Sequence, residues 1–170
     1  MERKNNLTYI PRSLAVLLIV ILLCSVFFTG CTADSTQEEV VIGIAWRADT
    51  DSEFYTNIVV AVEEAGGKPV LLDQVKADYL TYDSNNTLVD CTDEVGGLTL
   101  ESANAIKENL WESTNIEEVM QGIDAVILTG GEDISSSLYS DPEPWHGIEA
   151  EIDFNATRDA SDYILMSYCI

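Results

Sequence analysis

One continuous apolar run, Val40–Ala45, most constrains the fold of this chain. It is rich in β-branched residues and does not alternate polar with apolar side chains, which is the pattern of a strand buried on both faces of a parallel sheet. A helical pattern over Glu53–Ala65 and a short apolar run, Lys68–Leu72, follow it. Together they predict a β-α-β unit, with two parallel strands and a right-handed crossover.

Local signals mark both ends of the expected helix. Ser52 or Asp51 can cap its N-terminus, and Gly66-Gly67 can end it in the manner of a glycine C-cap. Its apolar side chains fall on one stripe, which we expect to face the sheet. The stripe consists of Phe54, Ile58, Val59, Val62 and Ala65.

The chain is less regular between Asp73 and Gly122, and no internal repeat is apparent. One or two helices are expected between Glu101 and Gln121. Their inward-facing side chains are predicted to be Ala103, Ile106, Leu110, Ile116, Val119 and Met120.

A third strand is expected over Ala125–Leu128, and a last helix over Asp159–Ile170 with Asp159 as its N-cap. These elements form a second β-α-β unit, whose strand joins the sheet of the first unit. The sequence therefore predicts a doubly wound, mostly parallel α/β domain.

Residues 1–30 resemble the signal peptide of a bacterial lipoprotein. A basic start precedes the apolar run Leu14–Phe28, which is shorter than the roughly 18 residues of a membrane-spanning helix. The run ends in Phe28-Thr-Gly-Cys31, which is similar to a lipobox. The resemblance implies that Cys31 becomes the lipid-modified first residue, that residues 31–39 form a polar tether, and that the protein is held on the extracytoplasmic face of the cell membrane. An uncleaved N-terminal anchor helix is the alternative.

The charge of the chain restricts its partners. Its 30 Asp and Glu residues outnumber 8 Lys and Arg residues, and the formal net charge is −22. Such a surface repels nucleic acid, so a nucleic-acid partner is excluded. His146 is the only histidine, and no cluster has metal-ligand spacing, so we expect no metal and no other cofactor. Cys91 and Cys169 can be free thiols or can form a disulfide.

The segment with the clearest chemical meaning is Leu128-Thr-Gly-Gly-Glu-Asp-Ile134. It follows the third expected strand, and in an open α/β sheet ligands bind beyond the carboxyl ends of the strands. Glycines there let a ligand approach the backbone, and their N–H groups can face an oxyanion. A tight turn that needs Gly130 and Gly131 only for their backbone angles is the alternative.

This segment, followed by Leu138-Tyr139 and then by Arg158-Asp159, resembles the class I glutamine amidotransferase-like hydrolases. The resemblance is nearest to the gamma-glutamyl-gamma-aminobutyrate hydrolase (peptidase C26) family. Val41–Ile44 resembles the first strand of that family, and Glu64–Val70 resembles its first helix-to-strand turn. We interpret the Arg158-Asp159 pair as helix capping and salt bridging before substrate binding.

The resemblance covers residues 40–170 and implies a flavodoxin-like glutaminase domain, with an insertion near residues 82–115. It implies the hydrolysis of gamma-glutamyl amide bonds in a small substrate by a cysteine nucleophile. In this family the glycine pair supplies an oxyanion-hole N–H, which implies Gly131 as the donor and Gly130 as its neighbour.

Further residues of this loop are implied by the same resemblance. Asp133 is a weaker candidate for a substrate contact, or it holds the turn through its backbone amides. The Pro and Gly that are usual in the loop are replaced by Ser136 and Ser140, which predicts a looser loop.

The residues that would perform the chemistry are not found. The family nucleophile is a cysteine on a Gly-x-Cys-x-Gly turn, followed by a His and a Glu. The chain ends roughly forty residues after the glycine pair without such a turn, and Cys169, inside the last expected helix, is a poor candidate. We therefore expect an incomplete C-terminus and no hydrolase activity from this chain alone. The alternatives are a non-catalytic binding lipoprotein that uses the same crevice, and a surface domain that binds a partner through residues 82–115.

Overall fold

The computed structural model describes residues 39–142 and 153–170. The expected signal peptide, the expected lipidation site Cys31 and His146 lie outside the described residues, as does the expected tether up to residue 38. None of the helices in the two described ranges has the length and hydropathy that a membrane crossing requires.

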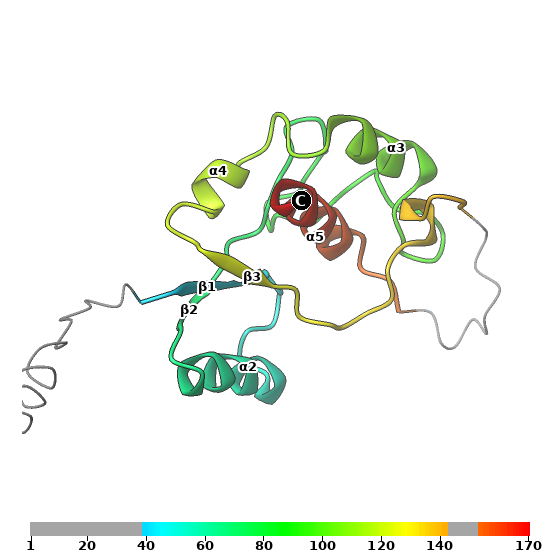
Figure 1. Cartoon of the computed structure of the whole chain (residues 1–170). Coiled ribbons are helices and arrows are strands. Elements are labelled where there is room, and N and C mark those ends of the chain that lie inside the picture. Colours follow the sequence, from blue (N-terminus) through cyan, green and yellow to red (C-terminus); the bar gives the residue numbers. More distant parts are fainter. Residues whose placement is uncertain (1–38, 143–152) are drawn as a thin grey trace, which may run out of the picture. The chain divides into compact units, whose positions relative to one another are not determined.

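Three parallel strands form the sheet: β1 (Val41–Ile44), β2 (Lys68–Leu71) and β3 (Ala125–Ile127). The strand order is β2-β1-β3, so β1 lies in the centre (Figure 1). Ile44 and the following Ala45 are fully buried. The prediction of a central parallel strand at this position is confirmed.

The first crossover is α2 (Glu53–Glu64), and both of its ends follow the sequence signals. The Ser52 hydroxyl caps the first turn by accepting a backbone N–H at 3.3 Å. At the other end Gly66 has a φ of +84°, and the N–H of Gly67 donates to the carbonyl of Val62 at 3.0 Å. This is a Schellman motif, in which a left-handed glycine lets the last carbonyls of the helix find donors.

The predicted inner stripe of α2 is partly wrong. Val62 is buried, but Phe54 is 57% exposed and Ala65 is also exposed. Tyr55 takes an inner position instead, and its hydroxyl donates a hydrogen bond of 2.5 Å to the carbonyl of Ala45. A tyrosine ring can be buried here because its hydroxyl reaches a backbone acceptor.

Two helices occupy the region after β2, as expected: α3 (Leu100–Asn109) and α4 (Ile116–Val119). Of the side chains predicted to face inward, Ala103, Ile106 and Ile116 are buried. Leu110 is not, because it ends α3 with a φ of +53° and is 39% exposed. The positive φ takes this residue off the helical path, so the helical spacing no longer sets its direction.

The region described above as an insertion contains a repeat that the sequence analysis did not identify. Tyr82–Val89 and Thr92–Thr99 are two turns with equivalent hydrogen bonds. In each turn an aspartate carboxylate accepts the backbone N–H groups two and four residues on, at 2.8 to 3.0 Å. The side chains that repeat are Asp83 with Asp93 and Leu88 with Leu98. Both leucines are buried in the core, so the two turns contribute side chains to the domain core although most of their polar residues are exposed.

The last helix, α5 (Ala156–Cys169), begins earlier than expected. Its N-cap is Asn155, whose side-chain oxygen accepts the N–H of Arg158 at 3.1 Å. The predicted capping by Asp159 is therefore wrong. Asp159 lies in the first turn of α5 and is buried, where it holds a neighbouring loop instead.

Figure 1 shows α2 on one side of the sheet and α3, α4 and α5 on the other. The core lies on the second side, where apolar residues of these three helices pack with the turns after β1 and β2. Its largest fully buried members include Leu98, Ile106, Ile116, Ile164 and Leu165. The described residues thus form a mixed α/β structure with an open, all-parallel sheet, which is compatible with a flavodoxin-like fold.

Candidate functional site

The candidate site lies between the carboxyl ends of β1 and β3. The chain leaves β1 towards α2 on one side of the sheet, and after β3 the next long helix, α5, lies on the other side (Figure 1). In an open parallel sheet, ligands bind in the crevice at such a switch in direction. Cavities of about 260 Å³ and about 550 Å³ lie there. Their shared wall consists of Arg47, Thr129, Gly130, Gly131, Glu132 and Arg158.

Gly130 and Gly131 lie on this shared wall with little to cover them. Both are exposed, and within the described part of the chain neither backbone N–H donates a hydrogen bond. Gly131 has a φ of +145°, a backbone conformation that residues with a side chain rarely adopt. Free N–H groups at the rim of a sheet can bind an anion or stabilise an oxyanion. The two glycines implied by the resemblance therefore lie where a ligand can reach them.

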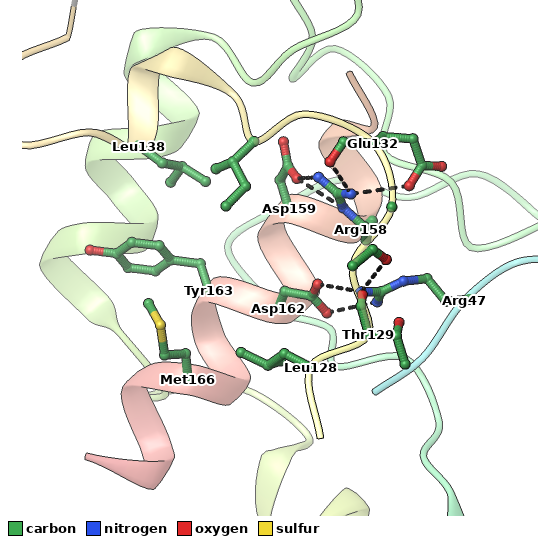
Figure 2. A pocket seen from close by; sticks show the side chains of 13 residues that line it. Arg47, Leu128, Thr129, Glu132, Leu138, Arg158, Asp159, Asp162, Tyr163 and Met166 are labelled. Carbon is green, nitrogen blue, oxygen red and sulfur yellow. Dashed lines mark hydrogen bonds and ion pairs between the residues drawn. The ribbon is translucent and has the colours of Figure 1, made fainter. Parts of the chain in front are cut away.

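Arg158 fixes the loop that follows the glycines. Its guanidinium is buried, and its five N–H donors reach the carbonyl and carboxylate of Glu132, the carbonyl of Asp133 and the carboxylate of Asp159. Figure 2 shows the dashed contacts from Arg158 to both carboxylates. The planar guanidinium binds backbone carbonyls and a side-chain carboxylate of the loop at the same time. It therefore restricts the loop more than a single ion pair would.

Asp159 holds the next part of the same loop. Its carboxylate accepts the N–H of Ser135 at 2.7 Å and also the Ser135 hydroxyl. The Ser135 oxygen in turn accepts the N–H of Leu98 at 2.8 Å, in the second turn of the repeat. The predicted salt bridging by Arg158 and Asp159 is confirmed, and the pair connects α5, the glycine loop and the repeat.

The ion pair of Arg47 with Asp162 is not among the contacts predicted from the sequence. The two side chains meet through two contacts of 3.0 Å, and Arg47 also donates to the carbonyl of Thr129 at 3.0 Å (Figure 2). The pair is separated by 115 positions in the chain. One signal was available, because Arg47 follows β1 closely at the carboxyl edge of the sheet, where ligands bind.

Two buried polar atoms of this wall lack partners. Within the described residues, neither the Nε of Arg47 nor the hydroxyl of Thr129 makes a hydrogen bond. Buried polar atoms are nearly always paired in folded proteins, so an exception points to strain, an ordered water or a ligand group. Both atoms belong to residues that line the two cavities.

Two carboxylates that line the smaller cavity have shifted pKa values, with opposite signs. Burial raises the pKa of Asp162 above its ordinary 3.8, although hydrogen bonding and the charge of Arg47 offset part of the rise. A hydrogen bond from its own backbone N–H lowers the pKa of Glu132, and the side chains of Asn155 and Arg158 lower it further. The two shifts therefore move the pKa values of Asp162 and Glu132 towards each other, from ordinary values of 3.8 and 4.5.

The raised pKa of Asp162 predicts how the Asp162→Asn variant responds to pH. The folded chain binds the Asp162 proton more tightly than the unfolded chain, so this group adds stability below pH 3.8 and loses it as the pH rises through the raised value. The difference in the free energy of unfolding, wild type minus variant, should grow as the pH falls from 7 towards 4. Urea denaturation across this range measures it, with Asp78→Asn as a control for the loss of one exposed carboxylate. A difference that shrinks as the pH falls would contradict the prediction.

The remaining residues of the loop are placed as follows. Asp133 is exposed and lines neither cavity; its N–H donates to the carbonyl of Asp153 at 2.8 Å, and its own carbonyl accepts from Arg158. This agrees with a role in holding the turn through its backbone, and a substrate contact stays a prediction. Ser136 begins a short 3₁₀ helix, η1 (Ser136–Leu138), and Ser140 is exposed.

Lys107 of α3 supports the loop around η1. Its ammonium group donates to the carbonyls of Ser137, at 2.6 Å, and Tyr139, at 2.9 Å. The loop with Ser136 and Ser140, which the sequence predicts to be looser, is therefore held by Lys107 and by the Arg158-Asp159 pair of α5.

Neither described cysteine belongs to the site. Cys91 is buried in the core and Cys169 is exposed at the end of α5, and both are free thiols. Neither of them lines the two cavities. In the ranges that the structure describes, no cluster of three or more His, Cys, Asp or Glu side chains could hold a metal ion.

No family model matches the chain, and neither the curated proteins nor the solved structures contain a significant match to it.

Proposed function

We propose that the crevice around Gly130 and Gly131 is the oxyanion-binding part of a gamma-glutamyl amide hydrolase site, on a doubly wound glutaminase domain of the flavodoxin-like type. We further propose that this chain by itself binds the gamma-glutamyl group without cleaving it. The resemblance to the gamma-glutamyl-gamma-aminobutyrate hydrolases supplies the substrate class. The observation that carries the proposal is the pair of glycine N–H groups at the carboxyl edge of a parallel sheet, which make no hydrogen bond within the described residues.

The positioning of these groups supports a role in charge stabilisation. An amide that is attacked, or a carboxylate that is bound, carries negative charge on oxygen, and fixed N–H donors stabilise it without having to reorganise. Arg158 and Asp159 hold the loop from Glu132 to Ser135, so the donors are held in place before a ligand arrives. No cofactor is needed for this role.

The residues around the crevice support the proposal that the chain does not cleave its ligand. Hydrolysis by the family mechanism requires a thiolate, and a histidine to take up its proton. The described residues that line the two cavities include neither cysteine nor histidine. This observation also favours the second candidate function, that of a non-catalytic extracytoplasmic binding lipoprotein anchored through Cys31.

Binding and turnover measurements test the proposal together. The full chain, purified in a non-ionic detergent, is titrated calorimetrically with gamma-glutamyl-gamma-aminobutyrate and incubated with a gamma-glutamyl anilide. We expect saturable binding of the first compound and no release of aniline from the second. Thiol-sensitive release of aniline would refute the claim that the chain does not cleave, and a lack of binding would refute the proposed ligand.

A further inference from the structure

The larger cavity has an aromatic wall on the side of β1 and α2. Trp46 and Phe54 line it, and Phe54 is 57% exposed although it belongs to a helix that has an inner face available. Tyr55 also lines this cavity, and its hydroxyl donates to the backbone carbonyl of Ala45. An exposed aromatic surface inside a cavity offers the negative face of its rings to a ligand, and this face attracts cations.

The two arginines of the cavity do not supply a free positive charge. Arg47 is paired with Asp162 through two contacts, and the donors of Arg158 are all engaged with the glycine loop and Asp159. No lysine or further arginine occurs among the described residues of the lining. A ligand carboxylate would therefore meet no unpaired cation in this part of the cavity.

Two carboxylates of the lining, by contrast, are without a cation. Asp49 and Asp153 both line the cavity and are exposed, and neither forms an ion pair within the described part of the chain. Near an aromatic wall, such carboxylates attract an ammonium group and repel an anion.

The same cavity is lined by Thr129, a residue that is 2% exposed, and within the described residues its hydroxyl makes no hydrogen bond. A buried hydroxyl without a partner is an independent sign that a polar group of a ligand belongs here. Thr129 directly precedes the glycine pair in the sequence and lines the cavity together with it.

We propose that the cavity selects gamma-glutamyl amides whose amine part ends in an alkylammonium group, held between Trp46, Phe54 and the carboxylates of Asp49 and Asp153. The inference rests on the proposed function for the gamma-glutamyl end of the ligand. It departs from that family's usual substrate, because the carboxylate of a gamma-aminobutyrate group would face Asp49 and Asp153 without a free cation.

Three ligands that share one propylene spacer test this inference. They are the gamma-glutamyl amides of 1,3-diaminopropane, butylamine and 4-aminobutyrate, which end in an ammonium, a methyl and a carboxylate group. Calorimetric titration of the full chain at low salt should rank them in that order, with the ammonium ligand about tenfold tighter than the carboxylate ligand. The ratio should fall at high salt, because screening weakens the contribution of exposed charges.

Charge variants separate the cavity from the overall charge of the chain. Asp49→Asn combined with Asp153→Asn should remove most of the preference, while Asp78→Asn combined with Asp90→Asn changes the same charge at two exposed positions that line neither cavity and should keep it. Phe54→Leu should weaken binding of the ammonium ligand more than that of the methyl ligand.

The outcomes distinguish this inference from the proposed function. If all three amides bind equally well, the gamma-glutamyl site stands and the ammonium preference is wrong. If propylammonium alone binds in an Asp49- and Asp153-dependent manner while no gamma-glutamyl amide binds better than its free amine, the ammonium site stands and the proposed function is wrong. If the control pair abolishes the preference as strongly as the cavity pair, the preference comes from the net charge and the inference is overturned.

Discussion

Replacement of Arg158 by Met is expected to lower the free energy of unfolding by about 3–5 kcal/mol, since removal of one partner leaves a buried charge uncompensated. Arg158 and Asp159 are 3% exposed each. The substitution also leaves the carbonyls of Glu132 and Asp133 without their donor. Because domains are stable by only about 5–15 kcal/mol, the loss should be visible as a large shift in the urea midpoint of the full chain.

A double variant identifies the cause of this loss. Arg158→Met combined with Asp159→Asn removes both charges and keeps a side-chain oxygen for the N–H of Ser135. We expect it to be more stable than Arg158→Met alone, by about 1 kcal/mol or more, because no unpaired buried charge remains. Arg158→Lys keeps the positive charge but lacks the planar guanidinium. Its free energy of unfolding should lie between those of the wild type and Arg158→Met. Equal stability of the single Met variant and the double variant would show that the unpaired carboxylate is not what destabilises the loop.

Gly131→Ala is expected to weaken ligand binding by about tenfold or more, which is the effect of losing one hydrogen bond to a charged acceptor. At a φ of +145° an alanine is strained, and its Cβ would lie 3.3 Å from Nη1 of Arg158. The backbone must rotate to relieve the strain and the close contact with Arg158. This rotation turns the N–H of residue 131 away from its original direction. Strain of this kind costs about 1–3 kcal/mol, so a matching loss of stability is expected.

The neighbouring glycine provides a matched control. A Cβ at Gly130 would meet nothing within 4 Å, and its φ lies outside the range that disfavours side chains. Gly130→Ala should therefore keep the stability of the wild type within about 0.5 kcal/mol and should bind more tightly than Gly131→Ala. If the two variants lose affinity equally, the distinct backbone conformation of Gly131 has no role in binding.

The elements set by local chemistry could be predicted from the sequence. The cap at Ser52 and the left-handed Gly66 each act within a few residues, so they mark the ends of α2 correctly. Short-range signals are less decisive where two residues offer the same chemistry. Asn155 and Asp159 can both cap a helix. Asn155 is the N-cap of α5, whereas the carboxylate of Asp159 is engaged with Ser135.

The contacts that build the site could be predicted only in part. The glycine pair and Arg158-Asp159 were identified by pattern, but the long-range pair of Arg47 and Asp162 depends on how α5 approaches the sheet, which no local pattern specifies. The turns at Asp83 and Asp93 were within reach of the sequence, since an aspartate and a leucine recur with the same spacing. They were missed because the glycines of the second turn correspond to polar residues in the first.

The central claim is that the N–H groups of Gly130 and Gly131 contact the ligand, and an NMR titration tests it most directly. The chain has ten glycines, so labelling with ¹⁵N-glycine gives a simple spectrum, in which the variants Gly130→Ala and Gly131→Ala identify the two signals. On titration with a gamma-glutamyl amide, the signals of Gly130 and Gly131 should shift with the binding curve, while those of Gly66 and Gly122 stay in place. Saturable binding that leaves the Gly130 and Gly131 signals unmoved would contradict the account.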